Sequence, residues 1–337
     1  MHTYFIVCHF HIFITYYDII INKSYGNEVL HMRINKISIV GMGALGILFG
    51  NYFVEKLGKD AVSFVLNKDR IKKYEKKLVK CNGNICDFKI VDEEEKIEPA
   101  DLLVIAVKGT GLDEALKSAK NQVGRNTIII SLLNGISSEQ IIGEAFGKEK
   151  IIYCIAQGMD AVKIDNELTF SHLGQLCIGI PKEEEYKSAM LNDLDEFFSF
   201  INLPHTVEDD IIHRLWSKFM LNVGVNQTVM IYEGNYGTVI NEGEARETMK
   251  NAMREVIELA KYEGVVLSED DLNGYVALID TLSKEGMPSM RQDGLAHRYS
   301  EVELFSGTVL RLAKKHNLTM KVNEYLYNKI KAIESQY

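Results

Sequence analysis

The sequence lacks the cysteine patterns that hold structural metals or disulfide frameworks. Its cysteines are odd in number, are scattered and include no C-x-x-C pair: Cys8, Cys81, Cys86, Cys154 and Cys177. The histidines are also dispersed and show no metal-ligand spacing. This pattern predicts free thiols in a reducing compartment, a cytoplasmic location and no metal site.

A surplus of basic residues is missing as well. The formal net charge is −9, from 38 Lys and Arg against 47 Asp and Glu. Nucleic acids and anionic membranes attract basic surfaces, so this balance argues against both as partners. A small anionic substrate is still allowed, because a local pocket can oppose the global sign. With 337 residues, 46% of them hydrophobic, the chain is long enough for two domains.

What the sequence does contain is a glycine-rich turn between a strand and a helix. In ISIVGMGALGILFG an apolar strand runs into the spacing G-x-G-x-x-G, and an amphipathic helix follows. The first glycine permits a tight turn, the second lets backbone approach a pyrophosphate, and the third lets helix and sheet pack closely. The helix N-terminus then faces the phosphates. The alternative is a turn without a ligand, but the context predicts a dinucleotide site at Gly41, Met42, Gly43, Ala44, Leu45 and Gly46.

A long uninterrupted apolar run is absent upstream of this turn. The stretch TYFIVCHFHIFITYYDIII is dense in aromatic and β-branched residues, but His9, His11 and Asp18 interrupt it and no positive segment precedes it. Neither a signal peptide nor a spanning helix fits well, and a membrane anchor is the alternative. Met32 with RINKISIV resembles the usual start of a Rossmann domain. We therefore expect residues 1–31 to be an extension, either a mis-assigned start or a poorly ordered tail.

The end of the second predicted strand, AVSFVL, bears on the choice between NAD and NADP. An Asp or Glu there would bind the ribose 2′-hydroxyl of NAD. Here Asn67 ends the strand and is followed by Lys68 and Arg70, which places cations near a 2′-phosphate. NADP is therefore favoured. The alternative is that Lys68 and Arg70 are solvated residues that open a helix.

Further apolar strands alternate with helical patterns. We expect strands at ICDFKIV, DLLVIAVK and TIIISLL and a β-rich run over 151–180. Continuous apolar strands with crossover helices predict an α/β fold with a parallel, doubly wound sheet. Ligands of such sheets lie beyond the carboxyl ends of the strands, where Lys108 and Asn134 fall. Either residue alone is otherwise an ordinary turn residue.

From about Glu185 the hydrophobic period changes to 3.6 and stays helical almost to Tyr337. An all-α domain should therefore follow the Rossmann-type domain. We expect three segments: the extension at 1–31, an NADP-binding domain at 32–205 and a helical domain for substrate binding and dimerisation at 206–337.

A polar stripe marks one helix of the second domain. Lys218, Asn222 and Asn226 recur at i, i+4 and i+8 in IIHRLWSKFMLNVGVNQTVM, where most other positions are apolar. The stripe spans about 12 Å, which suits a small polar metabolite. The alternative is a solvated helix face.

A second group lies in MPSMRQDGLAHRYSEVELFSGTVLRLAKKH. We expect Ser289 in a loop after Pro288, and Glu301 at the start of a helix. Serines before helices usually cap them, and acidic residues in first turns usually interact with the helix dipole. By itself this pair therefore indicates little.

As a set, these residues resemble the ketopantoate reductase (2-dehydropantoate 2-reductase) family from about Met32 to near the C-terminus. The resemblance depends on GMGALG, Lys108 in AVK, Asn134 in LLNGI, the polar stripe, and Ser289 and Glu301 with MRQD between them. It implies an N-terminal Rossmann domain, a helical C-terminal domain and a cleft between them. There NADPH would reduce 2-dehydropantoate to pantoate in pantothenate biosynthesis.

The resemblance also implies roles for the matching residues. Lys218 and Glu301 would be catalytic, with Lys218 as general acid and Glu301 holding substrate. Lys108 would lie near the nicotinamide, and the remaining polar residues would contact substrate or cofactor: Asn134, Asn222, Asn226 and Ser289. Family members often carry an arginine where Asn67 stands, so the 2′-phosphate would be bound by Lys68 or Arg70.

The chemistry of a reductase independently favours a lysine in the stripe. Reduction of a keto carbon turns its oxygen into an alkoxide that must be protonated. Lys218 can supply that proton, because burial lowers its pKa while a nearby Glu301 raises it.

Two alternatives stay open. One is an enzyme for another 2-oxo acid or an opine-type product. The other is an NADP-sensing binding protein without turnover, which would not need the lysine. A homodimer is also left open by the sequence.

Overall fold

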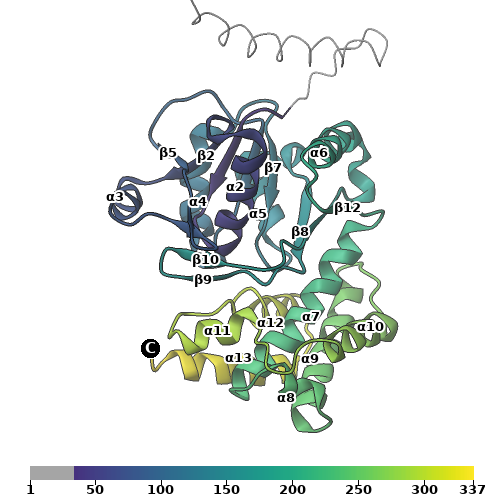
Figure 1. Ribbon diagram of the computed structural model, residues 1–337. Coiled ribbons are helices and arrows are strands. Elements are labelled where there is room, and N and C mark those ends of the chain that lie inside the picture. Colours follow the sequence, from purple (N-terminus) through teal and green to yellow (C-terminus); the bar gives the residue numbers. More distant parts are fainter. Residues whose placement is uncertain (1–33) are drawn as a thin grey trace, which may run out of the picture. The chain divides into compact units, whose positions relative to one another are not determined.

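The structure is a computed structural model that describes residues 34–337, apart from the side chains of residues 75 and 76. Figure 1 shows a sheet-containing part, coloured purple to teal, and a helical part, coloured green to yellow. The predicted extension at 1–31 lies outside the described residues. Within residues 34–337 no helix is both long and apolar enough to cross a membrane.

A parallel sheet forms the centre of the first part. Its strand order is β5-β2-β1-β6-β7, and all neighbouring strands are parallel. The strands are β1 (Ile37–Val40), β2 (Val62–Leu66), β5 (Lys89–Asp92), β6 (Leu102–Ile105) and β7 (Ile128–Ser131). All except β5 are buried at every position, as in sheets covered on both faces. This confirms the predicted doubly wound α/β sheet.

Crossover helices connect these strands. They are α2 (Ala44–Leu57), α3 (Lys68–Lys76) and α4 (Leu112–Ala119), and α5 (Ser138–Phe146) follows the last of these strands, β7. Helix α2 ends at Gly58, whose φ of 84° favours glycine. Helix α3 begins after Asn67, whose side chain accepts a hydrogen bond from the backbone N–H of Arg70.

The β-rich run over 151–180 contacts the central sheet through an isolated parallel bridge between Ile151 and Ile129 of β7, but it adds no strand to that sheet. It contributes to two smaller sheets, with orders β12-β11-β8 and β4-β3-β10-β9. Their strands are β3 (Lys80–Cys81), β4 (Asn84–Ile85), β8 (Tyr153–Gln157), β9 (Val162–Ile164), β10 (Glu167–Thr169), β11 (Gln175–Gly179) and β12 (His205–Val207).

The predicted strand ICDFKIV is likewise divided, between β4 and β5. The reason is a tight hairpin turn before it, in which Asn82 and Gly83 both have positive φ, 48° and 80°. This turn pairs β4 with β3 instead of with the central sheet.

The helical part contains most of the remaining helices. They are α7 (Ile211–Ile231), α8 (Tyr236–Ile240), α9 (Glu244–Tyr262), α10 (Glu269–Asp280), α11 (Ser289–Leu295), α12 (Ser306–Lys315) and α13 (Lys321–Glu334). Helix α6 (Ser188–Phe200) lies instead beside the sheet-containing part, next to β12 (Figure 1). The helical pattern begins near Glu185 as predicted, but β12 interrupts it between α6 and α7. The predicted domain boundaries stay predictions.

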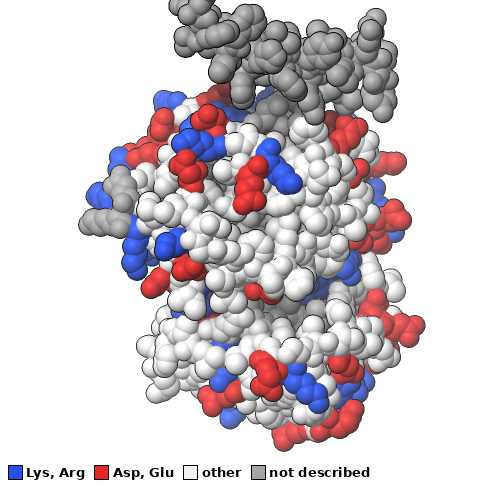
Figure 2. Space-filling model, in the orientation of Figure 1, with Lys and Arg blue, Asp and Glu red and all other residues white. Residues whose placement is uncertain are grey.

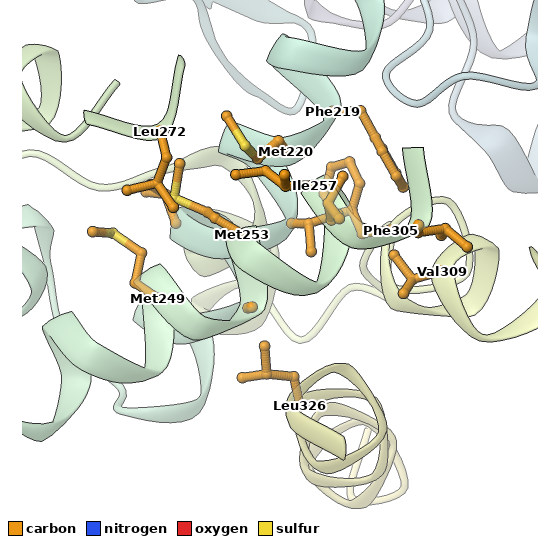
Figure 3. Packing of buried hydrophobic residues seen from close by; sticks show 14 of the residues in the cluster. Phe219, Met220, Met249, Met253, Ile257, Leu272, Phe305, Val309 and Leu326 are labelled. Carbon is orange, nitrogen blue, oxygen red and sulfur yellow. The ribbon is translucent and has the colours of Figure 1, made fainter. Parts of the chain in front are cut away.

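Helix α7 is the central helix of this part and lies against α9, α11 and α13. Figure 3 shows its Phe219 and Met220 packed with Met253 of α9 and with Phe305, and all four are buried. A Cβ at Gly224 of α7 would lie 2.5 Å from the Cγ of Met253, so the two helices approach closely. This packing fixes the rotation of α7 and therefore the direction of its polar stripe.

Two local predictions were wrong. Ser289 is the first residue of α11 instead of a loop residue. Glu301 lies in a turn ahead of α12 instead of beginning that helix. Its carbonyl accepts backbone N–H groups of Leu304 and Phe305, and the non-helical φ and ψ of Phe305, both −99°, delay the helix to Ser306.

Candidate active site

The glycine loop lies between the end of β1 and the start of α2. Gly41 has φ of 113°, and an added Cβ would collide with the carbonyl oxygen of Ala106. A Cβ at Gly46 would collide with the carbonyl oxygen of Gly41. Packing within the protein therefore explains these two glycines.

Gly43 is different. An added Cβ there would lie 3.6 Å from the carbonyl oxygen of Ala106, an ordinary contact, and the residue is exposed. Packing does not explain why this position is glycine. The absence of a side chain leaves the backbone of Gly43 open to close approach, as a pyrophosphate at the start of α2 would require.

A cleft of about 720 Å³ opens beside this loop, a size typical of small-molecule sites. Its walls come from the glycine loop, α3, the ends of β6 and β7, the β9–β10 hairpin, α11 and the turn before α12. The predicted site residues that line it are Gly41, Met42, Gly43, Ala44, Leu45, Arg70, Lys108, Asn134, Ser289 and Glu301. The cleft therefore joins residues from both parts of the chain.

An amide bridges the two predicted catalytic residues. The Nζ of Lys218 on α7 donates to the Oδ1 of Asn134 at 3.3 Å and to the carbonyl oxygen of Ala156 at 2.6 Å. The Nδ2 of Asn134 donates to the Oε2 of Glu301 at 2.9 Å. Asn134 lies in the loop after β7, so the sheet supplies the bridge between two groups of the helical part.

Burial changes the proton affinity of both groups. It lowers the pKa of Lys218 from 10.5 to about 8, against the opposing effect of the Glu301 charge. It also raises the pKa of Glu301, although the hydrogen bond from Asn134 and the charge of Lys108 act in the other direction. A lysine that titrates near the working pH is suited to donate a proton.

The rest of the polar stripe connects Lys218 to Ser289. Lys218 and Asn222 line a small cavity next to Asn134. The Nδ2 of Asn226 donates to the Oδ1 of Asn222 at 3.2 Å, and the Oγ of Ser289 donates to the Oδ1 of Asn226 at 3.4 Å. Because Asn226 is buried, the stripe is not a solvated helix face. It runs behind the cleft and reaches it through Asn134 and Ser289.

Sequence reasoning missed Asp293, which lies in the MRQD segment on α11. Its buried carboxylate accepts the Nζ of Lys108 at 2.6 Å and the Nε of Arg298 at 3.0 Å. Lys108 is thereby held against the cleft wall by a residue 185 positions later in the chain. The only signal in the sequence was an acidic residue between Ser289 and Glu301.

The cations on α3 differ in part from those predicted for a 2′-phosphate. Arg70 lines the cleft, and so does Lys73 from the same helix. Lys68 instead forms an ion pair with Glu94 and is not among the residues that line the cleft. Asn67 caps α3 and donates its amide to Glu114 at 2.7 Å.

Lys163 on β9 also lines the cleft and was not anticipated. Its pKa is lowered by burial and by the nearby charges of Lys73 and Arg298. These three cations therefore lie around the same part of the cleft. Like charges in proximity repel one another, so an anionic ligand would stabilise this arrangement.

On the face drawn in Figure 2, acidic and basic side chains are interspersed and no single basic patch is seen. Across residues 34–337, no group of three or more His, Cys, Asp or Glu side chains could hold a metal ion.

Comparisons with known proteins agree on one family. Family models described as "Ketopantoate reductase PanE/ApbA" and "Ketopantoate reductase PanE/ApbA C terminal" match residues 37–182 and 210–334. The chain is 28% identical over 313 residues to a 2-dehydropantoate 2-reductase of Aquifex aeolicus (strain VF5), covering 89% of this chain and 97% of that protein.

Solved structures show the same fold. The ternary structure of a D-mandelate dehydrogenase with NADH and anilino(oxo)acetate matches with a TM-score of 0.77 at 22% identity, covering 89% of this chain and 99% of that chain. A dimeric ketopantoate reductase from Staphylococcus aureus matches with a TM-score of 0.72 at 18% identity and the same coverage. Since the two family models together span most of residues 34–337, the chain belongs to the ketopantoate reductase family of oxidoreductases.

Proposed function

We propose that this protein reduces 2-dehydropantoate to pantoate with NADPH. The observation that carries the proposal is the hydrogen-bonded series from Lys218 through Asn134 to Glu301 at a cleft that also contains the glycine loop. The 2-dehydropantoate 2-reductase relative, which aligns over nearly its whole length, supports the same substrate.

The residues present fit a nicotinamide cofactor. The open backbone at Gly43 and the N-terminus of α2 would hold the pyrophosphate. Arg70 and Lys73 would bind the 2′-phosphate of NADPH, because both line the cleft near the glycine loop. The bound cofactor supplies the hydride that reduces the keto carbon.

Lys218 is the proton donor of the proposed reaction. It delivers a proton from Nζ to the substrate oxygen as negative charge develops there. Asn134 and the carbonyl of Ala156 hold the ammonium in place. Lys218 is left neutral and regains a proton from solvent.

The other polar residues would bind and orient the substrate. Glu301 would accept a substrate hydroxyl while Asn134 fixes its carboxylate. Ser289, which lines the cleft, would bind a remaining polar group, and Asn226 behind it would orient its hydroxyl. Asn222 would bind a substrate group that enters the small cavity beside Asn134. Lys108, held by Asp293, would lie beside the nicotinamide.

The first test is a panel of 2-oxo acids assayed by the loss of NADPH absorbance. We expect 2-dehydropantoate to have the highest kcat/KM. A higher value for another 2-oxo acid, or an opine-type product, would assign a different substrate, a real alternative because a structural neighbour binds anilino(oxo)acetate with NADH. Binding of NADPH without turnover of any acid would favour a sensing protein.

We also propose a homodimer, by analogy with the dimeric ketopantoate reductase of S. aureus. Light scattering coupled to size-exclusion chromatography measures the mass directly, and a monomeric mass for the full chain would refute it. The predicted cytoplasmic location stays a prediction.

A further inference from the structure

The segment after helix α11 places an arginine in the cleft that the proposed function does not use. Arg298 lies three residues before Glu301 and lines the cleft. Its Nε donates to the Oδ1 of Asp293 at 3.0 Å. Its two terminal nitrogens, Nη1 and Nη2, have no hydrogen-bond partner among the residues and side chains that the structure describes. A guanidinium that is held at one nitrogen and free at the other two can bind an anionic group through two parallel hydrogen bonds.

The backbone also holds Arg298 in this position. The chain leaves α11 through His297, whose φ of 49° lies in the left-handed region. The N–H of His297 donates to the carbonyl of Gly294 at 3.1 Å, and the N–H of Arg298 donates to the carbonyl of Asp293 at 2.9 Å. These two bonds form a Schellman motif, which usually has glycine at the left-handed position. Arg298 is therefore bound to Asp293 by its backbone as well as by its side chain, and its guanidinium is positioned in advance of any ligand.

Positive charge is in excess around Arg298 and along the cleft. The carboxylate of Asp293 is shared between two cations, Lys108 at Oδ2 and Arg298 at Oδ1. Three carboxyl groups line the cleft against five cations, which are Arg70, Lys73, Lys108, Lys163 and Arg298. The chain as a whole has a net charge of −9. A local surplus of the opposite sign indicates that this cleft binds an anionic ligand.

The strand order of the central sheet defines positions along the cleft. In the order β2-β1-β6-β7, the carboxyl ends lead in turn to α3, the glycine loop, Lys108 and Asn134. On the opposite, helical wall, Glu301 accepts the amide of Asn134 beside β7. Asp293 accepts the ammonium of Lys108 beside β6. The helical wall therefore follows the strand ends, with Glu301 opposite β7 and Asp293 opposite β6.

Arg298 continues this series toward the glycine loop. It binds the oxygen of Asp293 that Lys108 does not occupy. On its other side it lies near Lys163 of β9, on which the charge of Lys73 from α3 also acts, and all of these side chains line the same cleft. Arg298 thus lies between the level of β6 and that of α3. The strand that ends between those two levels is β1, which leads into the glycine loop.

We infer that Arg298 binds the diphosphate of the dinucleotide from the helical wall, opposite the glycine loop. The inference rests on the proposed function in one respect, that a nicotinamide dinucleotide occupies this cleft. The loop offers the diphosphate an open backbone at Gly43 and the N–H groups at the start of α2, but no cationic side chain. Arg298 supplies that full positive charge. Because the loop belongs to the sheet and Arg298 to the helical part, the bound dinucleotide is held by both.

The test compares Arg298→Gln with Arg311→Gln, a control on α12 that is exposed and is not among the residues lining the cleft. Calorimetric titration of the full chain measures the Kd for two probes. One is 2′-phospho-ADP-ribose, which contains the diphosphate but no nicotinamide, and the other is adenosine 2′-monophosphate, which lacks the diphosphate. In Arg298→Gln we expect the Kd for the first probe to rise at least about tenfold and the Kd for the second to stay unchanged. Neither Kd should change in Arg311→Gln.

A second variant covers a loss of stability in Arg298→Gln, which removes one of the two cations bound to Asp293. Arg298→Lys keeps a positive charge beside Asp293 but lacks the planar fork that binds two oxygens at once. The Kd for 2′-phospho-ADP-ribose should still rise, by about threefold or more, and the Kd for adenosine 2′-monophosphate should not. Thermal unfolding confirms that each variant is folded. An unchanged Kd for 2′-phospho-ADP-ribose in either folded variant would overturn the inference.

The remaining outcomes separate the inference from the proposed function. A raised KM for the 2-oxo acid with an unchanged dinucleotide Kd in Arg298→Gln would assign Arg298 to the substrate carboxylate and overturn the inference alone. An equal rise for both probes would show a general loss of the site and would also overturn it. A wild-type chain that binds 2′-phospho-ADP-ribose through Arg298 but reduces no 2-oxo acid would overturn the proposed function and support the inference.

Discussion

At the scale of single residues, the site depends on the proton that Lys218 carries. Lys218→Ala should lower kcat by about 10²–10⁴, the range for removing a positioned general acid. The Kd for NADPH should hardly change, because Lys218 lines the small cavity beside Asn134, on the far side of that residue from the glycine loop. Stopped-flow binding and steady-state kinetics separate the two effects. Lys329→Ala, an exposed position on α13, serves as control and should retain full activity.

The wild-type pH profile tests the same residue without mutation. Burial lowers the pKa of Lys218 to about 8, so the donor loses its proton as the pH rises through that value. We expect kcat/KM to fall about tenfold per pH unit above this point. Measurements between about pH 6 and pH 10 in buffers of constant ionic strength would reveal the limb. A rate that stays flat to pH 10 is incompatible with Lys218 as donor.

Single residues were predictable where their position follows from a local pattern. The stripe that contains Lys218 is set by helical period, and Lys108 and Asn134 follow strand ends. Asp293 and Lys163 could not be found this way, since each reaches the cleft only through contacts between distant segments. The prediction that Lys68 lies at the cofactor site was wrong for a related reason, because Lys68 forms an ion pair with Glu94 from another segment.

At the scale of elements, two glycines of the glycine loop should have different roles, Gly43 in ligand binding and Gly46 in packing. Gly43→Ala fits the protein but would narrow the approach of a phosphate, so the Kd for NADPH should rise at least tenfold, about 1.4 kcal/mol, with little change in melting temperature. Gly46→Ala should instead destabilise the fold by about 1–3 kcal/mol or more, because its Cβ collides with Gly41. NADPH fluorescence titrations and thermal unfolding measure the two effects. Equal loss of stability in both variants would contradict this distinction.

Helix α3 should set the preference between the two nicotinamide cofactors. We expect kcat/KM for NADPH to exceed that for NADH by at least tenfold, about 1.4 kcal/mol. Changing Arg70 and Lys73 to Ala should raise KM for NADPH and leave NADH nearly unaffected. Lys68→Ala is the matched control, since Lys68 pairs with Glu94 outside the cleft. A preference for NADH in the wild type would refute NADPH as the cofactor.

Long or strongly patterned elements were predicted well from sequence, and short ones were not. The strands β1, β2, β6 and β7 are continuous apolar runs, and their burial on both faces follows from that. The strands β3, β4, β9 and β10 have only two or three residues each, and they form two short hairpins that are joined by the pairing of β3 with β10 across the chain. Pairing partners of this kind are not encoded in a local hydrophobic pattern.

At the scale of the whole molecule, residues 34–337 already contain a complete central sheet, with β1 paired on both sides. Deleting residues 1–31 should therefore leave folding and turnover intact. Circular dichroism, kcat/KM and membrane co-sedimentation of both forms would test this. Loss of folding would show that the extension contributes to the domain, and loss of membrane association would support an anchor.

The amide of Asn134 has a fixed orientation, because the two charged groups on either side of it differ in sign. Its oxygen faces the ammonium of Lys218 and its nitrogen faces the carboxylate of Glu301. Rotating the amide by half a turn would place its N–H₂ group against a cation and its oxygen against an anion, so both charges oppose the flip. Once Lys218 has given up its proton, half of that opposition disappears. The orientation of the Asn134 amide would thus depend on whether Lys218 is protonated or neutral.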